Sequence, residues 1–163
     1  VSDLKAYFTF EYLAKLKEME VSIITQGIGY EAIFRQILKA LIDIFSRFST
    51  ENYAIVSVNS FLRDLDSTYP FFREVNVESA RSEGDPYHIS ITSHIDSISE
   101  TDARRAIQQL LVLAMDALGE NAKDEFIQNF KESLEKKYLS KIEELGVNFH
   151  MIELHQIIHA KAK

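Results

Sequence analysis

The chain has 163 residues, of which 46% are hydrophobic and 26% are charged, and its formal net charge is −7. This composition is ordinary for a folded globular domain and argues against intrinsic disorder. The acidic excess lies in residues 1–100, which carry 15 acidic and 9 basic residues. The chain therefore lacks the basic surface expected of a protein that binds nucleic acid or anionic membranes.

The absence of cysteine excludes disulfides, a thiolate nucleophile and cysteine ligands for zinc. No apolar run approaches the roughly 20 residues needed to cross a bilayer, and no signal peptide is recognisable. We therefore expect a cytoplasmic protein. Because no repeat or linker-like stretch interrupts the sequence, we expect a single globular domain over residues 1–163.

The N-terminal region is predicted to contain a helix over Leu4–Met19, where two rows of apolar residues recur at helical spacing. The face that they form is too wide for one neighbouring helix. This helix is therefore either wedged between two others or an arm that packs on a second subunit. Val21–Thr25 follows as a β-branched segment that fits a short buried strand, although five residues do not distinguish a strand from a helix.

The next segment, Tyr30–Phe48, is predicted as a helix because its apolar residues recur three and four positions apart. Asn52–Asn59 is rich in β-branched residues and is predicted as a strand. A short helix over Ser60–Asp66 is expected to follow, and Pro70 ends it.

A β-hairpin is predicted from two alternating segments, Glu74–Ser79 and His88–Ile95, which Arg81–Pro86 joins through turn residues. If Val21–Thr25 is also a strand, it could pair in parallel with Asn52–Asn59.

The helix predicted over Ser99–Gly119 is apolar nearly all the way round, which is typical of a helix covered on several sides. Ser99, followed three residues later by Asp102, resembles a capping box, and Gly119 stands where a left-handed C-cap is expected. We therefore expect this helix to be the buried centre of the fold.

A second long helix is predicted to begin at Asn121 and to end near Leu145 and Gly146. The tail Asn148–Lys163 is also predicted to be helical. Together these elements predict an α+β or mixed α/β domain, with a small, mostly antiparallel sheet of about three or four strands packed against several long helices.

A first candidate site is the segment Gly27–Ala32, which fits the pattern G-x-G-x-x-A before a helix. Such glycines allow phosphate to approach free backbone N–H groups at a helix N-terminus, so Gly27 and Gly29 are candidate phosphate-binding residues. The alternative is a plain turn between two elements.

Histidines supply two further candidates. His155 and His159 share a helical face and could hold a metal, or they are two solvent-facing side chains. His94 and Asp96, predicted on one face of a strand, could be a general base and the carboxylate that orients it. No nucleophile in a recognisable context accompanies that pair.

An aromatic cluster in the connection before the hairpin is the last candidate. Its rings either close the core or form the wall of a small-molecule pocket, in which arginines such as Arg63, Arg73 or Arg81 hold an anionic group. The residues proposed for such a ligand site are Phe61, Arg63, Tyr69, Phe71, Phe72 and Arg73.

In the absence of a catalytic constellation, we expect a non-enzymatic regulatory or sensory interaction module that self-associates through its helices and binds a small ligand. The order of elements over Tyr30–Asn59, followed by a hairpin, resembles that of small sensory domains of the GAF or PAS type, without a shared motif. The alternatives are an enzyme acting on a small anionic substrate and a metal-binding protein that uses the C-terminal histidines. The expected partner is a second copy or another protein, with neither nucleic acid nor membrane, and no particular cofactor is indicated.

Overall fold

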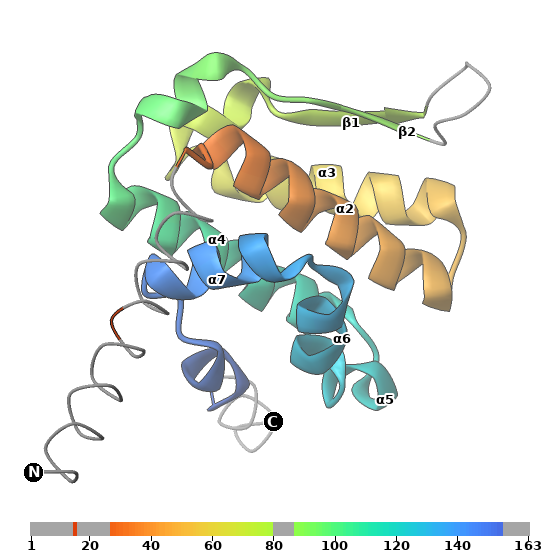
Figure 1. Ribbon diagram of the computed structural model, residues 1–163. Helices are drawn as coiled ribbons and strands as arrows, with labels where there is room; N and C mark the ends of the chain where they lie inside the picture. The colour runs from red at the N-terminus through yellow and green to blue at the C-terminus, as the bar shows by residue number, and fades with distance from the viewer. Residues whose placement is uncertain (1–14, 16–26, 80–86, 155–163) are drawn as a thin grey trace, which may run out of the picture.

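The computed structural model describes residue 15, residues 27–79 and residues 87–154 (Figure 1). Of the predicted helix Leu4–Met19 only Lys15 is described, and it is helical. The predicted strand Val21–Thr25 and the connection Arg81–Pro86 lie outside the described residues. An arm over residues 4–19 that packs on a second subunit therefore stays a prediction.

The described part of the chain is mostly helical and carries one small sheet. A further helical segment covers residues 149–154. The elements that precede it are, in chain order, α2 (Tyr30–Phe48), α3 (Glu51–Leu65), the 3-10 helix η1 (Pro70–Glu74), β1 (Asn76–Ser79), β2 (Tyr87–Ser90), the 3-10 helix η2 (Ser93–Ser97), α4 (Glu100–Ala117), α5 (Glu120–Lys123), α6 (Phe126–Ser133) and α7 (Lys136–Glu144).

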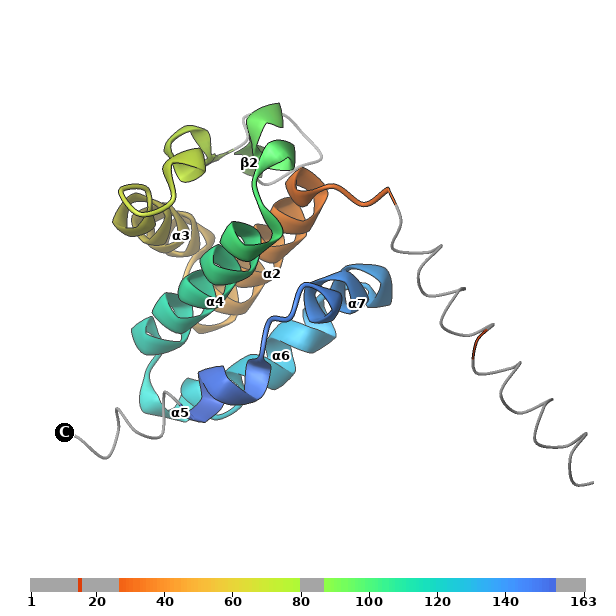
Figure 2. The same ribbon diagram turned by 90° about the vertical axis from the view of Figure 1, so that its left-hand side faces the viewer.

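Helix α2 has the predicted bounds and lies at the centre of these elements. It contacts α3, α4, α6, α7 and η2, and Figure 2 shows α3 and α4 on one side of it and α6 and α7 on the other. Its wide apolar face is thus covered within the same chain and gives no support for a second subunit. The buried residues of α2 are Ile33, Phe34, Ile37, Leu38, Ala40, Leu41, Ile42, Ile44 and Phe45.

Helix α4 begins after the predicted cap, since the Ser99 hydroxyl accepts a hydrogen bond of 3.1 Å from the Asp102 N–H. It is not the buried centre that its sequence predicts. Thr101, Arg105 and Gln109 leave one face of α4 exposed, and Val112 is half-buried. A helix that looks apolar all round in the sequence therefore packs against α2 and α3 on one side and meets solvent on the other.

Helix α3 replaces the strand predicted over Asn52–Asn59, so that prediction is wrong. The helix predicted over Ser60–Asp66 is present, but as the last part of α3, which ends at Leu65. The Thr50 hydroxyl caps α3 by accepting a hydrogen bond of 3.1 Å from the Tyr53 N–H. Helical spacing then places one row of apolar residues against α2, and this burial overrides the β propensity of the segment. The buried row consists of Ala54, Ile55, Val58, Phe61, Leu62 and Leu65.

The loss of that strand also removes the basis of the resemblance to GAF or PAS domains. Neither the strand that the resemblance needs nor a parallel partner for Val21–Thr25 exists over Asn52–Asn59.

The predicted hairpin is present, but the sheet that the described residues form has two antiparallel strands and not three or four. The register pairs Asn76 with Ser90 and Val77 with Ile89. The Asn59 side chain on α3 fixes the sheet, because its amide donates to the Val77 carbonyl at 2.8 Å and accepts from the Val77 N–H at 2.9 Å. The predicted second strand, His88–Ile95, ends early because η2 begins at Ser93.

The long helix predicted from Asn121 to Leu145 is broken into α5, α6 and α7. The chain turns at Leu134, which is extended and buried, so that both α6 and α7 pack against α2. The predicted C-cap at Gly119 is also wrong, because this residue is extended, with φ −65°, and precedes α5. Gly146 ends α7 with φ +93°, as predicted.

Candidate functional site

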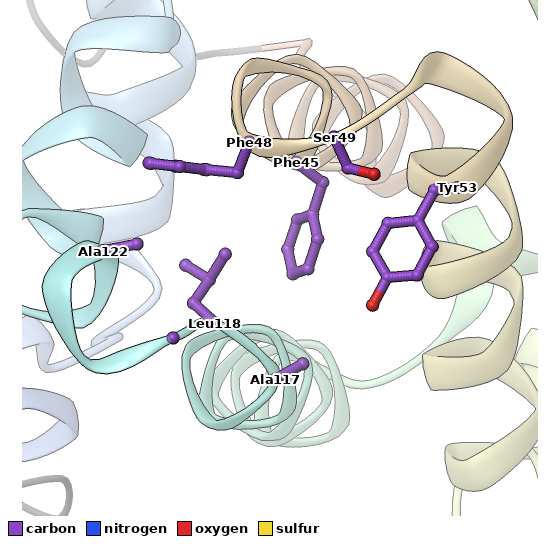
Figure 3. Close-up of a pocket in the computed structure, with 8 residues that line it drawn as sticks. Phe45, Phe48, Ser49, Tyr53, Ala117, Leu118 and Ala122 are labelled. Carbon is purple, nitrogen blue, oxygen red and sulfur yellow. The ribbon is translucent and has the colours of Figure 1, made fainter.

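A groove of about 450 Å³ with no charged lining residue lies at the C-terminal end of α2, between the α2–α3 turn and the α4–α5 turn (Figure 3). We call it the aromatic groove. Its lining residues are Phe45, Phe48, Ser49, Tyr53, Ala117, Leu118, Gly119 and Ala122.

Two turns of the backbone shape the aromatic groove. On one side α2 ends at Phe48, and the Thr50 cap starts α3 immediately afterwards. On the other side α4 ends where the Leu118 N–H donates to the Met115 carbonyl at 3.2 Å, and the extended Gly119 leads into α5. The groove therefore lies between two helix-to-helix connections that are far apart in the sequence.

The lining of the aromatic groove is uncharged, and large apolar surfaces in it remain exposed. Phe45 is 3% exposed and packs edge-on against Phe61, with 5.6 Å between the ring centroids. Phe48 and Tyr53 are 57% and 54% exposed. Val56, three residues after Tyr53 on α3, is 66% exposed but does not line the groove. Such a group of exposed side chains marks a candidate binding surface.

The predicted phosphate site at Gly27 and Gly29 holds a carboxylate of the chain itself. Oδ1 of Asp96, on η2, accepts a hydrogen bond of 2.9 Å from the Glu31 N–H in the first turn of α2. A Cβ atom placed on Gly29 would lie 2.5 Å from that oxygen, so the glycine gives the carboxylate its space. Gly27 has φ +87° and forms a turn before the helix.

A second, polar pocket of about 360 Å³ lies beside this cap, between α2, η2 and α7. The charged groups in it contact one another or the backbone. Arg35 donates to the Ile89 carbonyl at 2.8 Å and to Oε1 of Glu31 at 3.1 Å. Its lining residues are Gly29, Glu31, Ala32, Arg35, Gln36, Asp96 and Tyr138.

The placement predicted for His94 and Asp96, on one face of a strand, is wrong. Both lie in the 3-10 helix η2, because the strand ends at Ser90. Asp96 caps α2, and the structure gives it no contact that orients the His94 imidazole.

The predicted aromatic cluster divides between two places. Phe72 and Phe71 pack on Phe34 of α2, with ring centroids 5.5 Å and 6.0 Å from it, and Tyr69 lies against both of them. Phe61 packs elsewhere, against Phe45.

The arginines proposed with this cluster have different surroundings. Arg63 donates to the carbonyls of Phe72, Arg73 and Val75 at 2.6–3.0 Å, so its guanidinium holds η1 against α3. The Arg73 side chain is exposed, and Arg81 lies outside the described residues. These contacts give Arg63 a structural role, and an anionic ligand at the cluster stays a prediction.

The predicted metal ligands His155 and His159 lie outside the described residues. Within residues 27–79 and 87–154, no group of three or more His, Asp or Glu side chains could hold a metal ion.

Two tyrosines near the N-terminal end of α4 have perturbed pKa values. Burial raises the pKa of Tyr30 above 10.0, and the charge of Glu100 raises it further. Burial also raises the pKa of Tyr69, an effect that Arg105 opposes and Asp102 reinforces. Both phenols stay protonated at neutral pH, so neither is a general base there.

Sequence reasoning missed the aromatic groove entirely. The available signal was the phase of α3. With Ala54, Ile55 and Val58 on the buried row of a helix, Tyr53 and Val56 fall on the outer face, where they are left exposed. The strand predicted for this segment concealed that pattern.

No described helix has an apolar stretch that could cross a membrane. Comparison of the chain with protein-family models, curated proteins and solved structures finds no match. The aromatic groove is therefore the observation on which a functional proposal can be built.

Proposed function

We propose that the chain is a non-enzymatic regulatory or sensory interaction module that binds a small, largely apolar molecule in the aromatic groove. The observation that carries this proposal is the uncharged groove of about 450 Å³ in which Phe48 and Tyr53 are more than half exposed. Small-molecule sites in proteins typically measure about 300–1,000 Å³ and are lined mainly by apolar and aromatic side chains.

The physical gain on binding is the removal of these two rings from water. Apolar surface contributes about 25 cal/mol for each Å² that is buried, and a ligand between Phe48 and Tyr53 would cover both rings. The net charge of −7 disfavours an anionic ligand, because the field of the whole chain repels it. An uncharged ligand avoids both this repulsion and the lack of a counter-charge in the groove.

The proposal is tested by titrating the protein with Nile red, an uncharged dye whose fluorescence rises in apolar surroundings. We expect saturable binding to the wild type. Ala117 is exposed at the end of α4 and points into the groove, so Ala117→Glu places a charge there without disturbing the core. We expect this variant to bind the dye at least about tenfold more weakly, because an uncharged ligand would desolvate the carboxylate.

Gln109→Glu is the matched control, since it adds the same charge at an exposed position of α4 about two turns earlier. It should bind like the wild type, and circular dichroism should show that both variants are folded. Absence of saturable binding to the wild type, or equal affinity in the two variants, would overturn the proposal.

A further inference from the structure

The two walls of the aromatic groove differ in chemistry. Figure 3 shows Phe48 and Ala122 on one side of the Phe45 ring, with Leu118 facing it from α4. Ser49 and Tyr53 lie on the other side, and theirs are the only polar side-chain atoms among the lining residues. The groove thus has an apolar wall and a wall that carries two hydroxyl groups.

Neither hydroxyl makes a hydrogen bond to another described residue. Tyr53 donates its backbone N–H to Thr50, but its phenol has no such partner. Two other serine hydroxyls in the described helices are bonded to the chain. That of Ser46 donates to the Ile42 carbonyl at 2.6 Å, and that of Ser133 donates to the Asn129 carbonyl at 2.8 Å. The hydroxyls of Ser49 and Tyr53 are therefore available to a bound molecule.

We infer that Tyr53 and Ser49 determine the specificity of the groove, and that its ligand is an uncharged molecule with an aromatic body and a hydroxyl group at one end. This inference rests on the proposed function. The aromatic body lies against Phe45, Phe48 and Leu118. The hydroxyl bonds to the Tyr53 phenol, which can both donate and accept.

The uncharged lining of the groove disfavours charged groups on the ligand. A carboxylate or ammonium group in the groove would lose water without gaining a counter-charge, which costs far more than the loss of water from a hydroxyl. A ligand without any polar group would bury the two protein hydroxyls and leave them without partners, which also weakens binding. A ligand with an aromatic body and one neutral hydrogen-bonding group matches both walls, because its ring contacts the apolar wall and its polar group bonds to the hydroxyl groups of the other.

The test compares two ligands of similar size that are uncharged at pH 7, 2-naphthol and 2-methylnaphthalene, by NMR titration of the wild type and of Tyr53→Phe. We expect Tyr53→Phe to weaken the binding of 2-naphthol by about three- to tenfold and to leave the binding of 2-methylnaphthalene unchanged, because only 2-naphthol bonds to the phenol. Ser49→Ala should give a smaller change of the same kind. Tyr138→Phe removes a phenol remote from the groove and should change neither affinity.

The outcomes separate this inference from the proposed function. If the wild type binds both ligands but Tyr53→Phe and Ser49→Ala leave the ratio of their dissociation constants unchanged, the specificity inference is wrong and the groove remains a binding site. If neither ligand nor Nile red binds the wild type, the proposed function fails, and the inference fails with it. Tyr53 is more than half exposed, so its replacement by Phe should leave the thermal midpoint unchanged.

Discussion

At its N-terminal end, beside the polar pocket, α2 is capped by a carboxylate of its own chain and its Phe34 ring is covered, so we call this end the closed end; at its C-terminal end α2 borders the aromatic groove, where large apolar side chains are exposed. The Asp96 carboxylate bonds to the Glu31 N–H, and the rings of Phe71 and Phe72 cover Phe34. At the other end Phe48 projects from the last turn with more than half of its surface exposed. The two ends of α2 thus differ: at one end a backbone N–H group and an aromatic ring are covered by the same chain, and at the other end an aromatic ring remains exposed.

The comparison shows that the motifs recognisable in the sequence lie at the closed end of α2 and not at the aromatic groove. The glycine motif and the aromatic cluster, which attract attention in the sequence, are both near the closed end and stabilise the fold there. The aromatic groove carries no motif, because it is made by two connections that only tertiary packing brings together. An unsatisfied surface is therefore a better guide to function here than a recognisable pattern.

The largest expected effect on stability comes from replacing a phenylalanine by alanine at each end of α2. Phe34→Ala should lower the free energy of unfolding by about 3–5 kcal/mol, because Phe34 is 0% exposed and its loss leaves a cavity among the rings. Phe48→Ala should lower the free energy of unfolding by about 0.5 kcal/mol or less, since the side chain is mostly in solvent. It should instead weaken the binding of Nile red. Urea unfolding followed by circular dichroism measures both energies. Similar losses of stability in the two variants would mean that the C-terminal end is closed as well.

A smaller effect is expected at two glycines that both precede helices in an extended conformation. Gly29→Ala should destabilise the protein by about 1 kcal/mol more than Gly119→Ala, since only at Gly29 does the new Cβ displace the Asp96 carboxylate from its hydrogen bond. No atom lies within 4 Å of a Cβ on Gly119. Replacing glycine by alanine before a helix also changes the conformational entropy of the unfolded chain. This contribution to the free energy of unfolding is common to the two variants, so it cancels in their difference.

The double variant identifies the cause of that difference. In an Asp96→Ala background the carboxylate is absent, so Gly29→Ala should cost no more than Gly119→Ala does in the same background. Thermal or urea unfolding of the four combinations measures the coupling. A penalty at Gly29 that persists without Asp96 would contradict the cap as its origin.

The sequence predicts α2, the Ser99 cap and the hairpin because each is specified by residues close together in the chain. Helix α2 has its own long apolar row, and the hairpin has two alternating segments joined by turn residues. The strand prediction at Asn52–Asn59 fails because β-branched residues favour a strand locally, while burial against α2 and the Thr50 cap favour a helix. The breaks between α5, α6 and α7 are also set by packing on α2, which a one-dimensional pattern does not contain.

The candidate site is less predictable than the fold. Glycine and the aromatic residues near the hairpin could be recognised as unusual, but their partners, Asp96 and Phe34, come from other parts of the chain. The aromatic groove needs the ends of α2 and α4 to lie beside each other, and neither end contains a residue type that indicates this.

The smallest expected effect is a pH dependence at the closed end, where Tyr69 packs on Phe71 and Phe72. Burial raises the folded-state pKa of Tyr69 above the unfolded value of about 10, so between these two values the folded state holds the proton more tightly than the unfolded state. This contribution to stability is complete below pH 10 and is lost as the pH rises through the folded-state pKa. Urea midpoints measured from pH 8 to about pH 11.5 should therefore fall more steeply for the wild type than for Tyr69→Phe, which has no phenol to titrate. The lysines and the other tyrosines, which also titrate in this range, are common to both proteins, so parallel curves would show that Tyr69 is not held protonated by the closed end.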